Sequence, residues 1–311
     1  MPIAEKDKHK TAFRDADGRL WEFNRAGFSL TVLPTEFTRV VKTALEQPED
    51  DVVSWLDDIL VSSRTWEAHI NLLRTVFQKL VNARLSVHFA KCNFAAPSQE
   101  YLGMVVDSTG IRPAPSKLEA VINMPCPTNV EELRAFLGLT GYLRQFVEKH
   151  SIIAAPLTNI LRNKDFASKR ARKSVIPWEQ EQEQAFAQLK QALTSPKVLA
   201  FPNWGYTFTL HTDASSTGAG AALTQRKQNK EFVIAFASHK FSKQDARRGP
   251  IERECMAILW ATKHFRQYLP GRRFILITDC SALTWLFRSR ELSPKLHRWA
   301  LRLIEYDIVL Q

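Results

Sequence analysis

The stretch Tyr206-Thr207-Phe208-Thr209-Leu210-His211-Thr212-Asp213 alternates apolar and polar side chains until it reaches an acid. A period of two puts alternate side chains on opposite faces of a β-strand, so this segment predicts a half-buried strand that ends at Asp213. Two further strands are expected at 218–225 and 232–238, separated by the polar turn 226–231. The stretch therefore opens a three-stranded meander.

A helix and a fourth strand continue this half of the chain. One side of the expected helix recurs at helical spacing: Ile251, Cys255, Ile258, Leu259, Thr262 and Phe265. A strand is expected at 273–278, ending at Asp279, and helical segments follow near 281–287 and 295–305. The order βββαβα predicts an α/β domain.

The first half of the chain combines α and β patterns. Two short apolar runs within 52–62 enclose a pair of aspartates, which is typical of a β-hairpin. Apolar side chains at three- and four-residue spacing across 66–81 predict an amphipathic helix. Thr128 and Glu131 form a capping-box pattern, which predicts that a second helix starts at Thr128. The cationic stretch 162–173 is interpreted as a linker.

Composition and charge narrow the class of protein. The 311 residues leave room for two domains of roughly 100–200 residues each. A net charge of +11 and a pI near 9.6 favour a polyanionic partner. No apolar run is long enough for a membrane span, and the first ten residues do not resemble a secretory signal, so a cytoplasmic or nuclear location is expected, without secretion. The four cysteines form no C-x-x-C pair, which argues against a zinc site or a disulfide framework.

Three acids occupy places where they can act together. If the strands that end at Asp213 and Asp279 are parallel neighbours, both carboxylates lie at the same edge of the sheet. Glu254 borders the buried stripe of the intervening helix and can lean toward that edge. Such carboxylates repel one another unless a cation neutralises them, and oxygen ligands select Mg²⁺ or Mn²⁺, with a two-metal site as the hypothesis. The alternative is that aspartates after strands are ordinary turn formers or caps.

Asp57 and Asp58 lie at the tip of the expected hairpin. Aspartates are common at hairpin tips because they tolerate turn geometry, so a purely structural role is one interpretation. In nucleotidyl transfer, paired acids at such a tip help to hold the metal ions that bind the incoming triphosphate. Both interpretations stay open on the residues alone.

Several motifs together resemble the Pol polyprotein of gypsy-like LTR retrotransposons, from the reverse transcriptase palm into ribonuclease H. The resemblance covers nearly the whole length. Its motifs are Trp55-Leu56-Asp57-Asp58-Ile59-Leu60-Val61, Glu100-Tyr101-Leu102-Gly103, the segment 128–146, His211-Thr212-Asp213-Ala214-Ser215, Glu252-Arg253-Glu254-Cys255 and Thr278-Asp279.

The resemblance implies an α/β and α+β architecture in three parts. Residues 1–107 are expected to form a partial, ferredoxin-like palm without the fingers, and residues 108–175 a helical thumb and linker. Residues 176–311 are expected to form a connection helix and a ribonuclease H-like domain. In the family, the first polymerase aspartate precedes the segment that matches Pro2-Ile3-Ala4-Glu5, and a fourth ribonuclease H acid follows the segment that ends here at Gln311. We therefore expect a chain truncated at both ends, with a palm inactive in isolation.

The resemblance also implies residue roles. Asp57 and Asp58 match polymerase metal ligands, and Asp213, Glu254 and Asp279 match the ligands of the two catalytic metals of ribonuclease H. Nucleic-acid contacts are expected at eight positions: Trp55, Tyr101, Gly103, Arg226, Lys227, Lys240, Arg247 and Arg248. The five basic residues among them are expected to rim the acidic cluster.

The function expected from this resemblance is that of a reverse transcriptase and ribonuclease H fragment. Its ribonuclease H-like domain is expected to hydrolyse RNA in RNA–DNA hybrids with Mg²⁺ or Mn²⁺. The expected partners are an RNA–DNA hybrid or a primer–template, no membrane, and integrase or other Pol segments in a longer polyprotein. The alternative is a non-catalytic remnant that binds nucleic acid, because a retained fold and basic surface do not require a retained activity.

Overall fold

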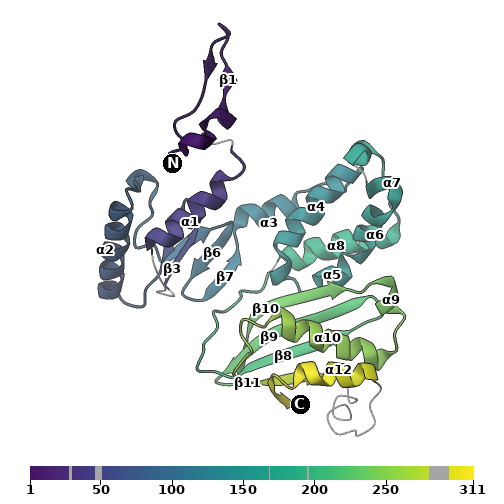
Figure 1. Ribbon diagram of the computed structural model, residues 1–311. Coiled ribbons are helices and arrows are strands. Elements are labelled where there is room, and N and C mark those ends of the chain that lie inside the picture. Colours follow the sequence, from purple (N-terminus) through teal and green to yellow (C-terminus); the bar gives the residue numbers. More distant parts are fainter. Residues whose placement is uncertain (28–29, 46–50, 168, 195, 280–293) are drawn as a thin grey trace. The chain divides into compact units, whose positions relative to one another are not determined.

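The computed structural model describes residues 1–27, 30–45, 51–167, 169–194, 196–279 and 294–311. It divides into two compact units, Met1–Ala95 and Ala96–Gln311, and each is described by itself (Figure 1).

The first unit carries a helix pair and two small hairpins. Its elements are a 3-10 helix Glu5–Thr11, β1 Phe13–Arg14, β2 Leu20–Trp21, α1 Leu33–Leu45, β3 Val52–Trp55, β4 Asp58–Val61, α2 Trp66–Asn82 and a 3-10 helix Phe89–Lys91. Leu72, Val76 and Leu80 of α2 are buried and pack against apolar residues of β3 and β4. The predicted hairpin and the predicted helix are therefore confirmed, and α2 covers the hairpin because its apolar stripe needs a partner.

The second unit begins with a three-stranded antiparallel sheet and a group of helices. The strands are β5 Ser98–Tyr101, β6 Met104–Asp107 and β7 Gly110–Pro113. The helices are α3 Pro115–Ile122, α4 Val130–Tyr142, α5 His150–Ile153, α6 Ala155–Arg162, α7 Lys164–Ala167 and α8 Gln180–Thr194, with 3-10 helices at Arg144–Phe146 and Lys169–Lys173. Leu133, Phe136 and Leu157 are fully buried in their common core, together with Leu189 and Leu193 of α8.

The start of α4 differs by one step from the sequence prediction. Asn129 rather than Thr128 is the N-cap, and its side chain accepts a hydrogen bond from the Glu132 backbone N–H at 3.0 Å. Glu132, not Glu131, reaches back and accepts from the Thr128 backbone N–H at 2.8 Å. Asparagine caps helices at least as well as threonine, so the same capping pattern is found one residue later than predicted.

A five-stranded sheet forms the rest of the second unit. Its strands are β8 Phe208–Ala214, β9 Gly218–Lys227, β10 Lys230–Lys240, β11 Arg273–Thr278 and β12 Asp307–Leu310, and its helices are α9 Lys243–Ala246, α10 Pro250–His264 and α12 Pro294–Leu303. The spatial order is β10-β9-β8-β11-β12. The first three strands are antiparallel, whereas β11 is parallel to both β8 and β12.

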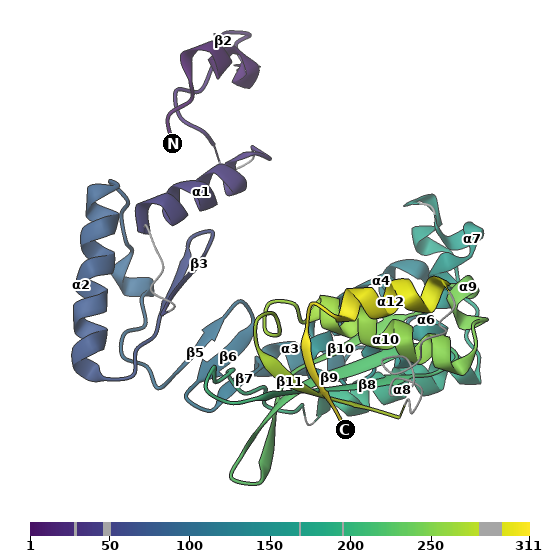
Figure 2. The same cartoon turned by 60° about the horizontal axis from the view of Figure 1, so that its bottom comes forward.

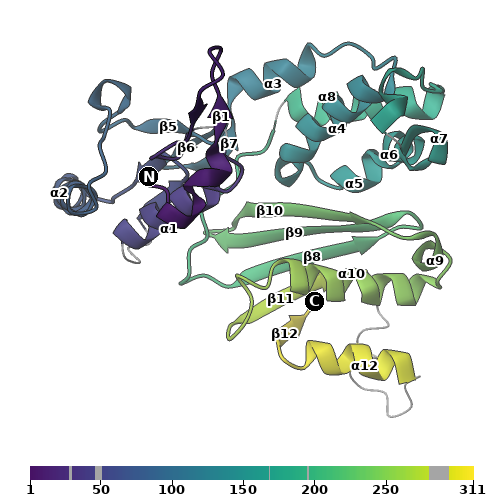
Figure 3. The same cartoon turned by 45° about the horizontal axis from the view of Figure 1, so that its top comes forward.

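Helices lie on both faces of this sheet (Figure 3). On one face, α10 packs against β8 and β9, and α12 lies beside α10 (Figure 2). On the other face, α5 contacts β9 and β10. The predicted order βββαβ and the helix near 295–305 are confirmed, and β12 was not predicted. The helix expected near 281–287 lies outside the described residues. In the part of the chain that the structure describes, no helix is long and apolar enough to cross a bilayer.

Candidate active site at the edge of the five-stranded sheet

Asp213 and Asp279 are brought together by two parallel strands. Thr212 of β8 is paired with Thr278 of β11, and each threonine is followed directly by its aspartate. Neighbouring strands lie about 4.8 Å apart, so the two acids leave the sheet at the same edge and next to each other. The predicted arrangement depended on parallel pairing of the two strands, and that condition is met.

Glu254 reaches the same edge from α10. Its Oε1 accepts a hydrogen bond from the Ala214 backbone N–H at 3.2 Å, directly after Asp213. Its Oε2 is buried and has no hydrogen-bond partner among the described residues. Burial is the main cause that raises the pKa of Glu254 above its usual value, and the negative charges of Asp213 and Asp279 raise it further. The three acids thus form one electrostatic cluster.

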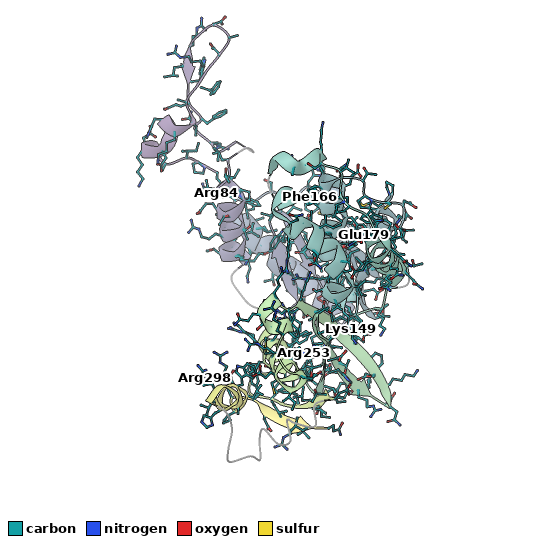
Figure 4. All side chains as sticks on the ribbon, turned by 90° about the vertical axis from the view of Figure 1, so that its right-hand side faces the viewer. Arg84, Lys149, Phe166, Glu179, Arg253 and Arg298 are labelled. Carbon is teal, nitrogen blue, oxygen red and sulfur yellow. The ribbon has the colours of Figure 1, made fainter. Side chains whose placement is uncertain are left out.

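Lys149 is the unexpected member of this site. It directly precedes α5, far from the three acids in sequence, and its ammonium forms an ion pair with Asp213 Oδ2. The hydrogen bond to Asp213 raises the pKa of Lys149, and the charge of Asp279 adds to the effect. Figure 4 shows Lys149 where the helical part of the second unit meets the five-stranded sheet.

The donor chemistry of the cluster fits a divalent metal ion. Three carboxylates supply the oxygen ligands that Mg²⁺ and Mn²⁺ prefer, and Glu254 holds one oxygen in place while the other lacks a hydrogen-bond partner within the described residues. In the same described ranges, no three His, Cys, Asp or Glu side chains are close enough together to hold a metal ion as they stand. The Asp213 carboxylate turns to Lys149 instead.

Asp57 and Asp58 lie at the tip of the β3–β4 hairpin in the first unit. Trp55 pairs with Asp58 across the tip, and both aspartates are exposed. Leu56, which directly precedes Asp57, has φ 53°, a left-handed conformation that is uncommon for leucine. Trp55 is 57% exposed, so its ring is available for contacts outside the hairpin.

Tyr101 and Gly103 flank the turn between β5 and β6. Gly103 has φ 68° and the preceding Leu102 has φ 51°, so the chain reverses through two left-handed residues. The Tyr142 hydroxyl of α4 donates a hydrogen bond to the Leu102 carbonyl, which ties this turn to the helices of the second unit. The Glu100–Gly103 motif therefore ends β5 and forms the turn into β6.

The basic residues that were expected to rim the acidic cluster separate into two groups. Arg226 and Lys227 lie at the end of β9 that pairs with the start of β8, whereas Gly220 near the other end of β9 pairs with Asp213. The expectation that these two residues rim the cluster is therefore wrong, because an antiparallel strand carries its last residues away from that edge. A contact of either residue with nucleic acid stays a prediction.

The remaining three basic residues lie at the end of the sheet that carries the acids. Lys240 pairs with Gly218, but its ammonium donates to the Ala155 carbonyl at 3.1 Å, to Thr158 Oγ1 at 3.2 Å and to Asn159 Oδ1 at 2.6 Å. Arg248 forms ion pairs with Asp245 at 2.8 Å and with Glu252 at 3.6 Å. Arg247 is exposed just before α10.

Lys149 was not predicted from the sequence, and no local sequence pattern indicates its role. The residue matches no motif, and its contact with Asp213 spans 64 positions of the chain. The contact exists because α5 packs on the sheet face. Such a placement depends on tertiary packing and leaves no trace in spacing or periodicity.

Comparison with known families gives the class of protein through two separate matches. Residues 8–106 match the reverse transcriptase (RNA-dependent DNA polymerase) family, and residues 203–306 match the RNase H-like domain found in reverse transcriptase. The chain thus carries a reverse transcriptase domain followed by an RNase H-like domain, and its homologues are Pol polyproteins of LTR transposons. The resemblance to LTR retrotransposon Pol proteins is confirmed.

Curated relatives come from transposons of flies and yeast. The chain is 36% identical over 308 residues to the retrovirus-related Pol polyprotein from transposon 297 of Drosophila melanogaster, covering 99% of this chain and 28% of that protein. It is 32% identical over 311 residues to the transposon Tf2-3 polyprotein of Schizosaccharomyces pombe, covering 98% of this chain and 23% of that protein. The chain thus spans about a quarter of these relatives.

Solved structures share the fold. One complex of the foamy viral protease-reverse transcriptase dRH with double-stranded DNA matches with a TM-score of 0.83 at 22% identity, covering 100% of this chain and 54% of that chain. A complex of the foamy viral protease-reverse transcriptase with an RNA/DNA hybrid matches with a TM-score of 0.78 at 22% identity, covering 99% and 41%. The predicted fold class is confirmed.

Proposed function

We propose that the RNase H-like domain of this chain hydrolyses the RNA strand of an RNA–DNA hybrid in a metal-dependent reaction. The observation that carries the proposal is the convergence of Asp213, Glu254 and Asp279 at one edge of the sheet, supported by the parallel pairing of β8 with β11. The match of residues 203–306 to the RNase H-like family supports the same reaction class.

The three acids are the proposed ligands of the catalytic metal ions. Two bound Mg²⁺ ions would activate a water molecule and stabilise the leaving oxygen of a phosphodiester. The chain's own part is to hold the carboxylates in place. The Ala214 N–H fixes one oxygen of Glu254, and the rigid ends of β8 and β11 set the separation of the two aspartates.

The proposed substrate is recognised by its negative charge. A net charge of +11 favours a polyanion, and binding of phosphates by lysine and arginine weakens steeply as salt rises. The similarity to a foamy viral enzyme solved with an RNA/DNA hybrid supports the choice of hybrid. Among the predicted basic contacts, Arg247 is the best placed, because it is exposed just before the helix that carries Glu254.

For the first unit we propose nucleotidyl transfer chemistry as the role of Asp57 and Asp58. The match of residues 8–106 to the reverse transcriptase family supports this role. The left-handed Leu56 adds a structural reason, since a strained residue at a hairpin tip is kept where the turn must aim particular side chains. Integrase or other Pol segments remain proposed partners in a longer polyprotein.

A hybrid cleavage assay tests the nuclease proposal. Purified chain is incubated with an RNA–DNA duplex labelled on the RNA strand, across a titration of Mg²⁺ and of Mn²⁺. We expect RNA fragments that disappear with EDTA and with Asp213→Asn. The matched control is Asp307→Asn, an exposed acid that pairs with Arg273 at the opposite end of β11. Absence of products at every metal concentration would refute the proposal.

A second candidate is a protein that binds nucleic acid without cleaving it. The observation that favours it is the ion pair of Asp213 with Lys149, which engages a carboxylate that catalysis needs. Salt-sensitive binding of the hybrid without any product would support this candidate over the nuclease.

A further inference from the structure

The Lys149–Asp213 ion pair joins the helical part of the second unit to the acidic edge of the sheet. The two side chains are 42% and 47% exposed, so the pair lies where solvent and ions reach it. The Lys149 ammonium also lies within the field of Asp279. It is therefore a cation beside two of the three carboxylates.

Local structure holds Lys149 in this place. Its backbone adopts φ 56° and ψ 25°, a left-handed conformation at the N-cap of α5. Two residues further along, Ser151 donates its backbone N–H to Ser238 Oγ at 2.7 Å and its hydroxyl to the Ser238 carbonyl at 3.0 Å. These two hydrogen bonds attach the start of α5 to β10. They hold the backbone that carries Lys149 against the sheet.

The sheet has a matching gap for the lysine stem. Gly220 is the register partner of Asp213, and a Cβ added there would lie 3.1 Å from Lys149 Cγ. The absence of a side chain at Gly220 lets the lysine stem cross β9 and reach the carboxylate. The left-handed backbone of Lys149, the attachment of α5 to β10 and the missing side chain at Gly220 together allow the Lys149 side chain to reach Asp213.

We propose that Lys149 is an internal counter-cation of the carboxylate cluster, which divalent metal ions must displace from Asp213 when they bind. This inference rests on the proposed metal site. An ammonium ion and Mg²⁺ compete for the same carboxylate oxygens, and a nearby positive charge repels a second cation. Lys149 therefore weakens metal binding and stabilises the three acids when divalent cations are scarce. It is a positioning residue rather than a catalytic one.

Metal binding to the full chain tests the proposal directly. Protein stripped with EDTA and dialysed is titrated with Mg²⁺ alone and with Mn²⁺ alone by calorimetry. We expect Lys149→Met to bind both ions about 3- to 10-fold more tightly than the wild type, while Lys149→Arg stays close to it. Methionine keeps an unbranched stem over Gly220 and removes the ammonium group, with its charge and its hydrogen bond to Asp213.

Lys263→Met is the matched control, because it removes one exposed lysine charge from the helix that carries Glu254 without touching Asp213. It should leave both affinities within about twofold. Equal or weaker metal binding by Lys149→Met than by the wild type would overturn the proposal, as would an equal gain in Lys263→Met.

A second measurement does not depend on metal or on activity. Lys149→Met, Asp213→Asn and the double variant are unfolded with urea in EDTA. We expect the shifts of the two single variants to be non-additive, because each removes the same ion pair. Additive shifts would overturn the proposal. Failure to cleave a hybrid would refute the proposed nuclease alone, since it changes neither the titrations nor this cycle.

Discussion

Asp279 directly follows β11 at the level of Asp213 near the end of the parallel strand β8, because Thr278 and Thr212 are register partners. The two acids belong to segments that are far apart in the chain, and a single strand pairing places them side by side. This relationship places both carboxylates in the same proposed site.

Asp213→Asn and Asp279→Asn should therefore lose hybrid cleavage to a similar extent. We expect each to lower the rate by at least about 100-fold, and the double variant to be little worse, because residues that act as one unit are not additive. The measurement is single-turnover cleavage of labelled hybrid at saturating Mg²⁺. A variant that keeps near wild-type rates would remove that acid from the site.

Substitution by alanine at the two glycines of β9 should change the free energy of unfolding by very different amounts. At Gly218 a Cβ would run into the His239 carbonyl oxygen of the backbone, which cannot move without breaking the β9–β10 ladder. At Gly220 it would meet only the flexible stem of Lys149. We expect Gly218→Ala to lower the free energy of unfolding by about 3 kcal/mol and Gly220→Ala by about 1 kcal/mol or less. Urea unfolding measures both, and the reverse order would contradict the packing described.

Stability should fall in mild acid because of His150. Burial is the main cause that lowers its pKa from 6.5 to about 4, and the positive charge of Arg144 adds to it. The unfolded chain then binds a proton that the folded chain does not, so stability is present above the unfolded pKa and is lost as pH falls from 6.5 toward 4. We expect a loss of about 2–3 kcal/mol across this window.

His150→Leu should flatten this part of the pH profile, whereas His297→Gln, at an exposed histidine of α12, should leave it unchanged. Urea unfolding at pH 7 and at pH 4.5 gives the comparison. A profile of His150→Leu that still falls as steeply as that of the wild type would assign the acid sensitivity to other groups.

Arg247 and Lys240 should differ in their contribution to hybrid binding. The ammonium of Lys240 is engaged by three oxygens of α6, and its burial lowers its pKa to about 8. Arg247 is exposed. We expect Arg247→Gln to weaken binding and to reduce the salt slope by about 1, while Lys240→Gln changes the slope little. Fluorescence anisotropy with labelled hybrid at several salt concentrations measures both slopes. Equal slopes for the two variants would show that the contacts of Lys240 open on binding.

Much of the architecture was predictable because it depends on short-range periodicity. The strand at 273–278 matches β11, the hairpin within 52–62 matches β3 and β4, and the helix at 66–81 matches α2. The cap of α4 was displaced by one residue because Asn129 and Thr128 compete for the same role. The strand β12 was not predicted, since four residues that follow a helix carry little pattern of their own.

The order of elements along the chain, βββαβ, and the positive charge follow from the sequence alone, since each depends on residue type and local spacing. The sequence also pointed to Asp213, Glu254 and Asp279, but the condition that places the two aspartates at one edge was met only in the fold, by the parallel pairing of β8 with β11. Which basic residues share an edge with those acids was settled only by the fold, because antiparallel pairing sends Arg226 and Lys227 to the far end of β9. The contact of Lys149 with Asp213 was also decided only by the fold. It arises from a helix docked on a sheet face, and packing between segments 64 residues apart has no counterpart in local sequence.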